Sequence, residues 1–417
     1  MTQNKPQRFF YGYVVVSATF FVMVVGWGGI YSFGVFLKPI LIDFGWTNAA
    51  TSGAYSLYMF IHGLFYIVTG RLTDRFGPRA VLTACGILLG LGYLLMSRVD
   101  LIWQLYLFYG LIIGIGMSGF FVPIVSTVVR WFVERRGLMT GIVVAGAGAG
   151  TMVLPPLAGW LISNYGWRTC YVIVGIIIML SVVSAAQFLR RDPAQMGQSP
   201  YGEPESDVNV PGLRSGLAGF SLFEAIRTSQ FWVITAILFC FGFSLQTVMV
   251  HIVTHAIELG NSAVISASIM TFIGGLSIAG RLIIGIASDI IGNKRALVIC
   301  LIFLPCALFG LMGAKELWML YLFAAIFGFA YGGEISLSSP IVAEVFGLKS
   351  HGIILGFILF LGATAGGAIG PLVAGRVFDI TGNYQPAFLI SAVVALTALA
   401  LISFLRPMSR KVKADGA

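Results

Sequence analysis

One arginine stands in the middle of an apolar segment that is long enough to cross a lipid bilayer. Arg281 lies within the run SIAGRLIIG, residues 277–285. A charged side chain at the bilayer centre costs about 2.5–3.5 kcal/mol or more, so such a residue is usually kept for a function. A guanidinium stays charged and offers a planar fork of N–H donors that matches a carboxylate. We therefore predict that Arg281 binds an anion.

Glu334 is the other charged residue that we place deep in an apolar segment. It has two alternative interpretations. In the first, Glu334 and Arg281 form a structural ion pair and neither touches a ligand. In the second, Glu334 is a proton-coupling residue: its ionised form neutralises Arg281, and its protonated form frees the arginine, so that an anion and a proton bind together.

Lys38 and three histidines are further candidates for chemistry. Lys38 could be a lysine that snorkels to the membrane interface, or a cation that attracts an anion at the mouth of a binding site. His62 could carry protons, although a hydrogen-bonded packing role is the commoner one for such a residue. His251 and His255 share one helix face, but this spacing alone is weak evidence for a metal site. We predict no metal and no cofactor.

The composition indicates a membrane protein. Charged residues make up 10% of the chain and hydrophobic residues 58%, with a mean hydropathy of +0.94, whereas soluble domains carry about 25% charged residues. The net charge of +9 is best explained by loops that face anionic lipid, and we expect no nucleic-acid partner. The sequence holds no ATP-binding loop, no HExxH motif and no convincing Ser-His-Asp set, so we do not expect an enzyme.

Twelve apolar segments are each long enough to span about 30 Å of hydrocarbon, which takes about 20 residues. Their bounds are 10–37, 48–70, 79–97, 101–129, 137–163, 167–189, 231–257, 263–288, 296–314, 317–345, 351–379 and 385–405. We predict an all-α membrane protein of two six-helix bundles, residues 1–189 and 231–417. Residues 190–230 are predicted to form a cytoplasmic linker, with a short amphipathic helix at 221–227 on the membrane surface.

The positive charges predict the orientation. With the N-terminus inside, 19 of the lysines and arginines fall in cytoplasmic segments and five, including Lys38, in outer ones. Cytoplasmic loops of membrane proteins carry an excess of lysine and arginine. We therefore predict that both termini are cytoplasmic.

An internal repeat relates the two predicted bundles. A shift of 215 residues aligns residues 70–79 with 285–294, and residues 106–108 with 321–323, without a gap. One offset that serves both a loop and distant helices indicates two homologous halves, related by an axis along the membrane normal.

The segment GRLTDRFGPR, residues 70–79, resembles the signature loop of the major facilitator superfamily, and residues 285–294 contain a weaker copy. The residues that carry the motif are Asp74, Arg75, Gly77, Arg79 and, in the second copy, Asp289. The resemblance implies the twelve-helix fold of that superfamily, a gating role for this loop on the cytoplasmic face, and a carrier that works as a monomer.

Within that superfamily the chain resembles the monocarboxylate transporters and their bacterial relatives, including oxalate–formate exchangers. The likeness is carried by residues 31–39, 44–46, 136–138, 166–168, 251–260 and 280–281. It implies that Arg281 is the substrate arginine, that Lys38 attracts the anion from outside, and that the central cavity is lined by aromatic residues. These aromatic residues are Tyr31, Phe121, Tyr331 and Phe360.

Two departures from the family pattern affect the expected mechanism. Animal members carry an acidic residue one helical turn before the arginine, where this chain has Ser277. We therefore take Glu334 as the candidate proton site, with His62 as a second candidate. The oxalate exchangers carry a lysine in the eleventh span, whereas residues 357–363 here hold no charge. One deep cation matches one carboxylate, because a dianion would leave a charge unpaired in a low dielectric.

These observations lead to one prediction of function and several alternatives. We predict a secondary transporter of a small monocarboxylate such as lactate or pyruvate, coupled to protons and working by alternating access in a bacterial inner membrane. The alternatives are an organic-anion exchanger of the oxalate–formate kind, or a drug/proton antiporter. The second of these is kept because residues 145–156 hold a glycine–proline element. A more remote alternative is a membrane sensor that binds a ligand without moving it.

Overall fold

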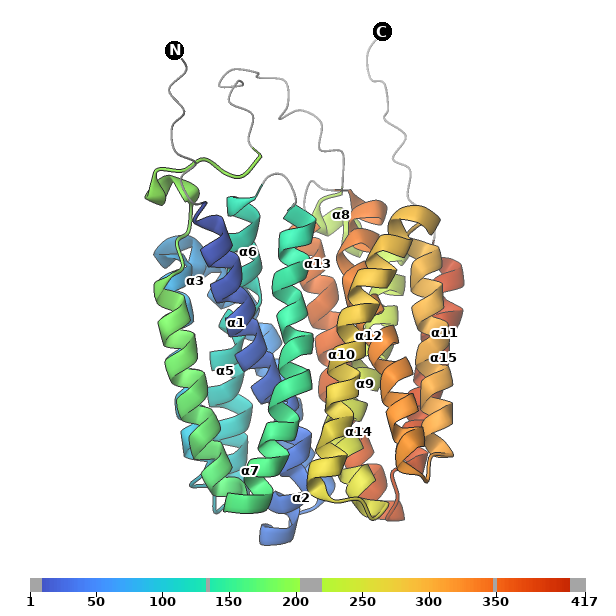
Figure 1. The fold of residues 1–417 in the computed structure, drawn as a ribbon. Helices are drawn as coiled ribbons and strands as arrows, with labels where there is room; N and C mark the ends of the chain where they lie inside the picture. The colour runs from blue at the N-terminus through green and yellow to red at the C-terminus, as the bar shows by residue number, and fades with distance from the viewer. Residues whose placement is uncertain (1–9, 133–135, 203–219, 348–350, 406–417) are drawn as a thin grey trace, which may run out of the picture.

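The computed structural model describes residues 10–132, 136–202, 220–347 and 351–405. Within these ranges the chain is built from helices and contains no β-strand. A chain of this hydropathy is expected to form helices in lipid, because a helix hydrogen-bonds its own backbone N–H and C=O groups. The long helices run side by side (Figure 1).

The first group of helices precedes residue 190. It comprises α1 (Gly12–Tyr31), α2 (Phe33–Phe44), α3 (Asn48–Met96), α4 (Ile102–Leu105), the π-helix η1 (Tyr106–Ile113), α5 (Gly114–Met117), the 3₁₀-helix η2 (Ser118–Phe120), α6 (Val122–Trp131) and α7 (Arg136–Gln187). A short 3₁₀-helix, η3 (Pro193–Met196), follows.

The second group follows residue 220. It comprises α8 (Leu222–Ile226), α9 (Ser229–Glu258), α10 (Ala263–Ile291), α11 (Asn293–Met312), α12 (Leu317–Phe346), α13 (His351–Leu359), the π-helix η4 (Phe360–Thr364), α14 (Ala365–Thr381), α15 (Gln385–Leu401) and the 3₁₀-helix η5 (Ile402–Phe404). The helix predicted at 221–227 is α8, which begins with a capping box between Ser221 and Glu224.

The described residues contain ten helical segments that are long and apolar enough to cross a membrane. Several predicted spans are fused. The second and third form α3, in which Gly77 leaves helical geometry at φ 81°, and the fifth and sixth form α7, which breaks at Gly166 with φ 79°. The loop predicted after residue 70 is therefore helical as far as Gly77, because no helix-breaking residue precedes it and Pro78 then suits the first turn of a new helix. The count of twelve spans remains a prediction.

The internal repeat has a counterpart in the backbone. The 215-residue shift that aligns the sequence pairs Gly77 with Gly292, and both adopt a positive φ, 81° and 87°. The same shift pairs Gly45 with Gly260, at 63° and 92°. Only glycine adopts such angles readily, so both halves turn the chain with the same residue type at matching places.

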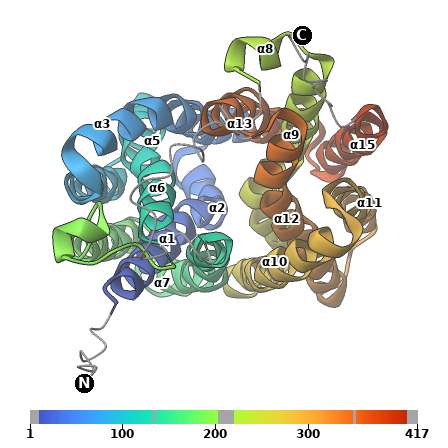
Figure 2. The ribbon, with the colours of Figure 1, turned by 90° about the horizontal axis from the view of Figure 1, so that it is seen from above.

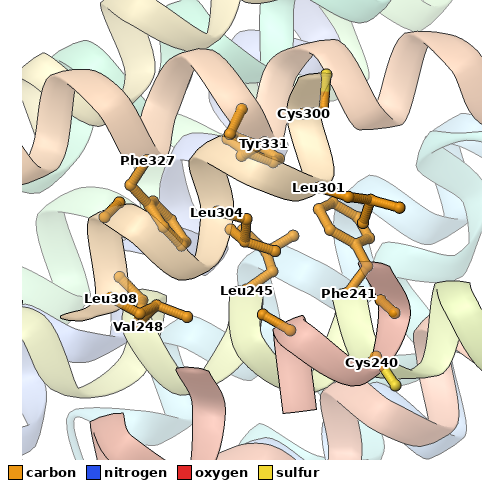
Figure 3. Close-up of a cluster of buried hydrophobic side chains, with 14 of the residues drawn as sticks. Cys240, Phe241, Leu245, Val248, Cys300, Leu301, Leu304, Leu308, Phe327 and Tyr331 are labelled. Atoms are coloured by element: carbon orange, nitrogen blue, oxygen red, sulfur yellow. The ribbon is translucent and has the colours of Figure 1, made fainter. Parts of the chain in front are cut away.

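Buried apolar side chains form two separate clusters. One is drawn from residues 15–189 with Val250 added, and the other from residues 225–405 together with Tyr31 and Val35. Figure 2 shows α1 to α7 on one side of the molecule and α9 to α15 on the other. Figure 3 shows part of the second cluster, in which α9, α11 and α12 pack together around Leu304 and Leu245. The boundaries of the two predicted domains remain a prediction.

Polar contacts join the two groups at the end of the molecule that is predicted to face outward. The Asp379 carboxylate, on α14, accepts hydrogen bonds from the backbone N–H groups of Asn48 and Ala49, at 2.8 and 2.9 Å. The Tyr384 hydroxyl donates to Oδ1 of Asn48 at 2.9 Å. A carboxylate at a helix N-terminus satisfies unpaired N–H groups and complements the helix dipole. Asp379 therefore caps α3 from the other group.

Replacing Asp379 with asparagine should loosen this end. The variant loses the charge and one acceptor, which costs about 1–2 kcal/mol. Amide hydrogen exchange at residues 48–52 should become about 5–30 times faster. The matched control is Asp100→Asn, because Asp100 pairs with Arg168 inside the first group. Unchanged exchange at residues 48–52 in Asp379→Asn would contradict the proposed cap.

Candidate functional site

Arg281 lies on α10 and is 8% exposed. Its Nη2 donates to the Tyr331 hydroxyl at 3.0 Å, and the guanidinium carbon lies 5.3 Å from the centre of the Tyr331 ring. Neither Nε nor Nη1 has a hydrogen-bond partner, and no carboxylate of the described residues forms an ion pair with Arg281. A buried cation with two unused donors has hydrogen-bonding capacity that an anion could satisfy.

Gly148 on α7 brings the first group of helices against this guanidinium. A Cβ atom added at residue 148 would lie 2.8 Å from Nη1 of Arg281 and 2.9 Å from the Ser277 hydroxyl. A Cβ added at Gly274, on α10, would likewise lie 2.6 Å from the carbonyl oxygen of Gly148. The two helices approach this closely because glycine stands at both positions. Arg281 therefore lies at the interface between the two groups.

Glu334 is fully buried on α12, and neither carboxylate oxygen has a hydrogen-bond partner in the described part of the chain. It lines a cavity of about 10 Å³ with Ile237, Leu297 and Ser338 among its neighbours. This is close to the smallest space that holds one water molecule. The ion pair with Arg281 that one interpretation required is not formed in this structure. An ionised carboxylate here would have no counter-charge, which is unfavourable by several kcal/mol.

Lys38 lies on α2 and forms an ion pair with Glu258 at the end of α9. Both side chains are partly exposed, 27% and 37%. The pair joins the two groups of helices at the same end as Asp379. No role was predicted for Glu258, although a lysine and a glutamate at the ends of two predicted spans are residue types that favour such a contact.

The predicted aromatic residues fall into separate places. Tyr31 is buried, its ring centre lies 5.5 Å from that of Trp27, and its phenol lies next to the phenol of Tyr331. Tyr31, Tyr331 and Arg281 therefore belong to one site. Phe121 contacts Tyr66 at 6.3 Å between ring centres. Phe360 contacts Phe60 at 6.2 Å.

His62 is 2% exposed, and neither ring nitrogen has a hydrogen-bond partner. The sequence favoured a packing histidine with hydrogen-bonded ring nitrogens, and the structure shows a packing histidine without those hydrogen bonds. Its ring stacks on Tyr58, with 5.4 Å between ring centres, and lies edge-on to Trp27 at 5.8 Å. Tyr66 lies closer still, at 4.5 Å.

The outer histidines have structural partners. His251 Nε2 lies 3.0 Å from the carbonyl oxygen of Pro371, and Nδ1 lies 3.3 Å from the Tyr384 hydroxyl. His255 packs edge-on against Phe388. Among the described residues, no group of three His, Cys, Asp or Glu side chains is placed to hold a metal ion.

The signature loop is described in part. Gly77 supplies the break in α3, Arg75 lies over the ring of Phe76 at 5.1 Å, and Arg79 donates from Nε to the Gln187 side chain at 2.8 Å. The side chains of Asp74 and Asp289 lie outside the described part of the structure. The gating role of the loop remains a prediction.

Comparison with known proteins identifies the family. The model of the Major Facilitator Superfamily matches residues 19–312 and 276–416. Rat "Monocarboxylate transporter 13" is 26% identical over 403 residues, covering 94% of this chain and 89% of the relative. The "Oxalate:formate antiporter" of Oxalobacter formigenes is 28% identical, covering 96% and 93%. An "Uncharacterized MFS-type transporter" of Escherichia coli, YhjX, is 31% identical, covering 70% and 71%.

A solved structure has the same fold. A bacterial homologue of the human lysosomal transporter Spinster superposes with a TM-score of 0.76 at 16% identity, covering 95% of this chain and 97% of the other. The family match extends over nearly all of the described helices, and the apolar segments agree with a multi-pass integral membrane protein. The resemblance inferred from residues 70–79 is confirmed: this chain belongs to the major facilitator superfamily and is a membrane transporter.

Proposed function

We propose that this transporter carries a small monocarboxylate, and that Arg281 binds the carboxylate group. The observation that carries the proposal is the pair of unused donors on a buried guanidinium, Nε and Nη1. A carboxylate accepts two parallel N–H bonds from such a fork, which adds geometric selection to charge attraction. Relatives named as monocarboxylate transporters support the same substrate class.

Charge balance favours one carboxylate over two. Arg281 is the one lysine or arginine that is buried among the described residues. A dicarboxylate would bring a second negative charge into the same low-dielectric site without a matching cation, which is unfavourable. We therefore place lactate-like and pyruvate-like acids ahead of oxalate.

Glu334 is our candidate for proton coupling, with His62 as the second candidate. Glu334 combines complete burial with two unpaired oxygens, so an ionised form needs a partner in some other state of the transport cycle. We propose that this partner is Arg281 in a conformation of the empty carrier other than the one in this structure, and that protonation of Glu334 separates the pair. The anion and the proton then cross together as a neutral set.

Lys38 fits a role at the outer mouth. Lys38 is paired with Glu258 while the two groups of helices are joined at that end. When they separate, Lys38 is freed to attract an incoming anion before Arg281 binds it. We retain the orientation with both termini in the cytoplasm, a bacterial inner membrane and a monomeric carrier as parts of this proposal.

An organic-anion exchanger is the second candidate function, because the oxalate:formate antiporter matches 96% of this chain. A symporter and an exchanger differ in their need for a counter-anion. Uptake into vesicles preloaded with unlabelled acid would be strongly accelerated for an exchanger and weakly for a proton symporter.

Arg281 provides the first test. Arg281→Lys keeps the charge and loses the fork, and should lower uptake of labelled lactate and pyruvate at least about tenfold; Arg281→Ala should lower it further, because a charge-assisted hydrogen bond contributes about 1.5–3 kcal/mol. The assay uses proteoliposomes under an imposed pH gradient. Arg227→Gln, at an exposed arginine of the surface helix region, is the control. Full uptake by Arg281→Ala would refute the proposal.

Gly148 provides the second test. In Gly148→Ala the new methyl group meets the guanidinium, and the resulting displacement should cost about 1–2 kcal/mol and raise KM about 5–30-fold. The matched control is Gly141→Ala, two helical turns earlier on α7, where an added Cβ meets nothing within 4 Å. Equal kinetics of the two variants would show that the close approach at Gly148 does not matter for substrate.

Glu334 provides the third test. Glu334→Gln removes the titrating group and keeps its shape, so uptake should no longer be accelerated by an inward proton gradient, while exchange between labelled and unlabelled acid persists. Glu344→Gln, at an exposed position of the same helix, is the control. If Glu334→Gln responds fully to the pH gradient, Glu334 is not the coupling residue.

A further inference from the structure

Three buried polar ring atoms in the first group of helices have no hydrogen-bond partner among the residues that the structure describes. They are both ring nitrogens of His62 and the indole nitrogen Nε1 of Trp27. The two rings meet edge to face, with 5.8 Å between their centres and 79° between their planes. Buried polar atoms of this kind are nearly always hydrogen-bonded, so three in one contact call for an explanation.

These atoms lie at the interface between the two groups. Trp27 packs against both buried clusters, that of residues 15–189 and that of residues 225–405. Gly63, next to His62, approaches Phe360 and Thr364 of the second group so closely that a Cβ there would lie 2.5 Å from the Thr364 methyl group. Trp27 therefore lies where the two groups face each other, and the His62 ring lies against it.

A chain of ring contacts connects this region to Arg281. Trp27 lies 5.5 Å from Tyr31 between ring centres, and the Tyr31 phenol lies next to that of Tyr331. Tyr331 in turn accepts the hydrogen bond of Arg281. The interface between the two groups is lined by aromatic rings. The first group contributes the uncharged donors and acceptor of His62 and Trp27, and the second group contributes the cation of Arg281.

The chemistry of the unpaired atoms defines what they can bind. A neutral imidazole offers one N–H donor and one acceptor nitrogen, and an indole offers one N–H donor. A hydroxyl group can accept from the indole N–H and pair with one ring nitrogen of His62, and a carbonyl oxygen can accept from the indole N–H and from the imidazole N–H. The two ring nitrogens point to different edges of the ring, so one such group pairs with only one of them. We propose that His62 and Trp27 form a second substrate subsite, which binds an uncharged hydroxyl or carbonyl group on the acid whose carboxylate binds Arg281. This inference rests on the proposed function and adds to it the residues that recognise the hydroxyl or oxo group of lactate-like and pyruvate-like acids.

A site built to hydrogen-bond a polar group rejects the analogue that lacks it, because the site's own atoms are then left unpaired. The wild-type transporter should therefore prefer a hydroxy or oxo acid over the unsubstituted acid of the same chain length by about tenfold in kcat/KM. A series with the hydroxyl group on the second, third or fourth carbon, measured in proteoliposomes, locates the subsite relative to the carboxylate.

His62→Phe is the decisive variant, because it keeps an aromatic ring for Tyr58 and Tyr66 and removes both nitrogens. It should reduce the preference to nearly one, because uptake of hydroxy and oxo acids falls more than uptake of the unsubstituted acid. Trp27→Phe, which removes the indole N–H, should reduce the preference in part. Tyr93→Phe is the matched control: its hydroxyl is also buried and unpaired, but it lies near Gly29 inside the first group, so the preference should stay.

The outcomes separate this inference from the proposed function. If the wild type carries unsubstituted and substituted acids equally well, the subsite is refuted and the role of Arg281 stands. If His62→Phe lowers uptake of every acid equally and removes the response to the pH gradient, His62 carries protons and the inference is wrong. If no acid is taken up, the proposed function fails, and the subsite fails with it. Thermal stabilisation of each variant by the acids in detergent gives a readout that does not depend on transport.

Discussion

A buried guanidinium without a counter-charge is the constraint on which this structure depends. Desolvating Arg281 is unfavourable, and among the described residues only the Tyr331 hydroxyl and the face of its ring compensate for it. An ion pair inside the protein would have made α10 more stable and closed the site. In the proposed mechanism a bound anion supplies the missing compensation at the two unpaired nitrogens, and its binding would also stabilise the assembled interface between the two groups of helices.

The glycines of α7 and α10 make that interface possible. Gly148 and Gly274 let two helices from different groups approach to backbone contact beside the arginine. At the end predicted to face outward, Asp379 and the Lys38–Glu258 pair join the groups through polar contacts instead. Small residues give close contact that can slide or separate at little cost, whereas charged contacts give discrete arrangements that are either made or broken. A carrier that alternates between two states needs both kinds.

Sequence reasoning reached the family, the helices and the central arginine for identifiable reasons. Hydropathy predicts where apolar helices lie, and a single charge in such a helix draws attention to Arg281. Helix ends were predicted less well. Residues expected to form loops between spans are helical in α3 and α7, because the chain turns at a single residue, Gly77 or Gly166, instead of over a loop of several residues. Helix propensity, which is summed over many residues, does not predict a break in a helix at a single residue.

The contacts between the halves could not be predicted in the same way. Asp379 caps a helix that begins more than 300 residues earlier, and Gly148 faces Arg281 from a different half, so both depend on how the groups dock. Glu334 was expected to face Arg281, since both are charges deep in the membrane, yet its carboxyl lies among apolar side chains of α9 and α11. The direction of one side chain on a helix is set by packing, which a single sequence does not encode in a readable pattern.

The most direct test of the central claim measures where a bound acid sits. Solid-state NMR on the transporter in lipid, with ¹³C in the carboxylate of the acid and ¹⁵N in the arginine guanidinium groups, reports the distance between the two. A carboxylate bound to the fork predicts a nitrogen–carbon distance of ~4 Å or less, with the signal absent in Arg281→Lys. Binding of the acid without any such short distance would contradict the assignment of Arg281 as the carboxylate site.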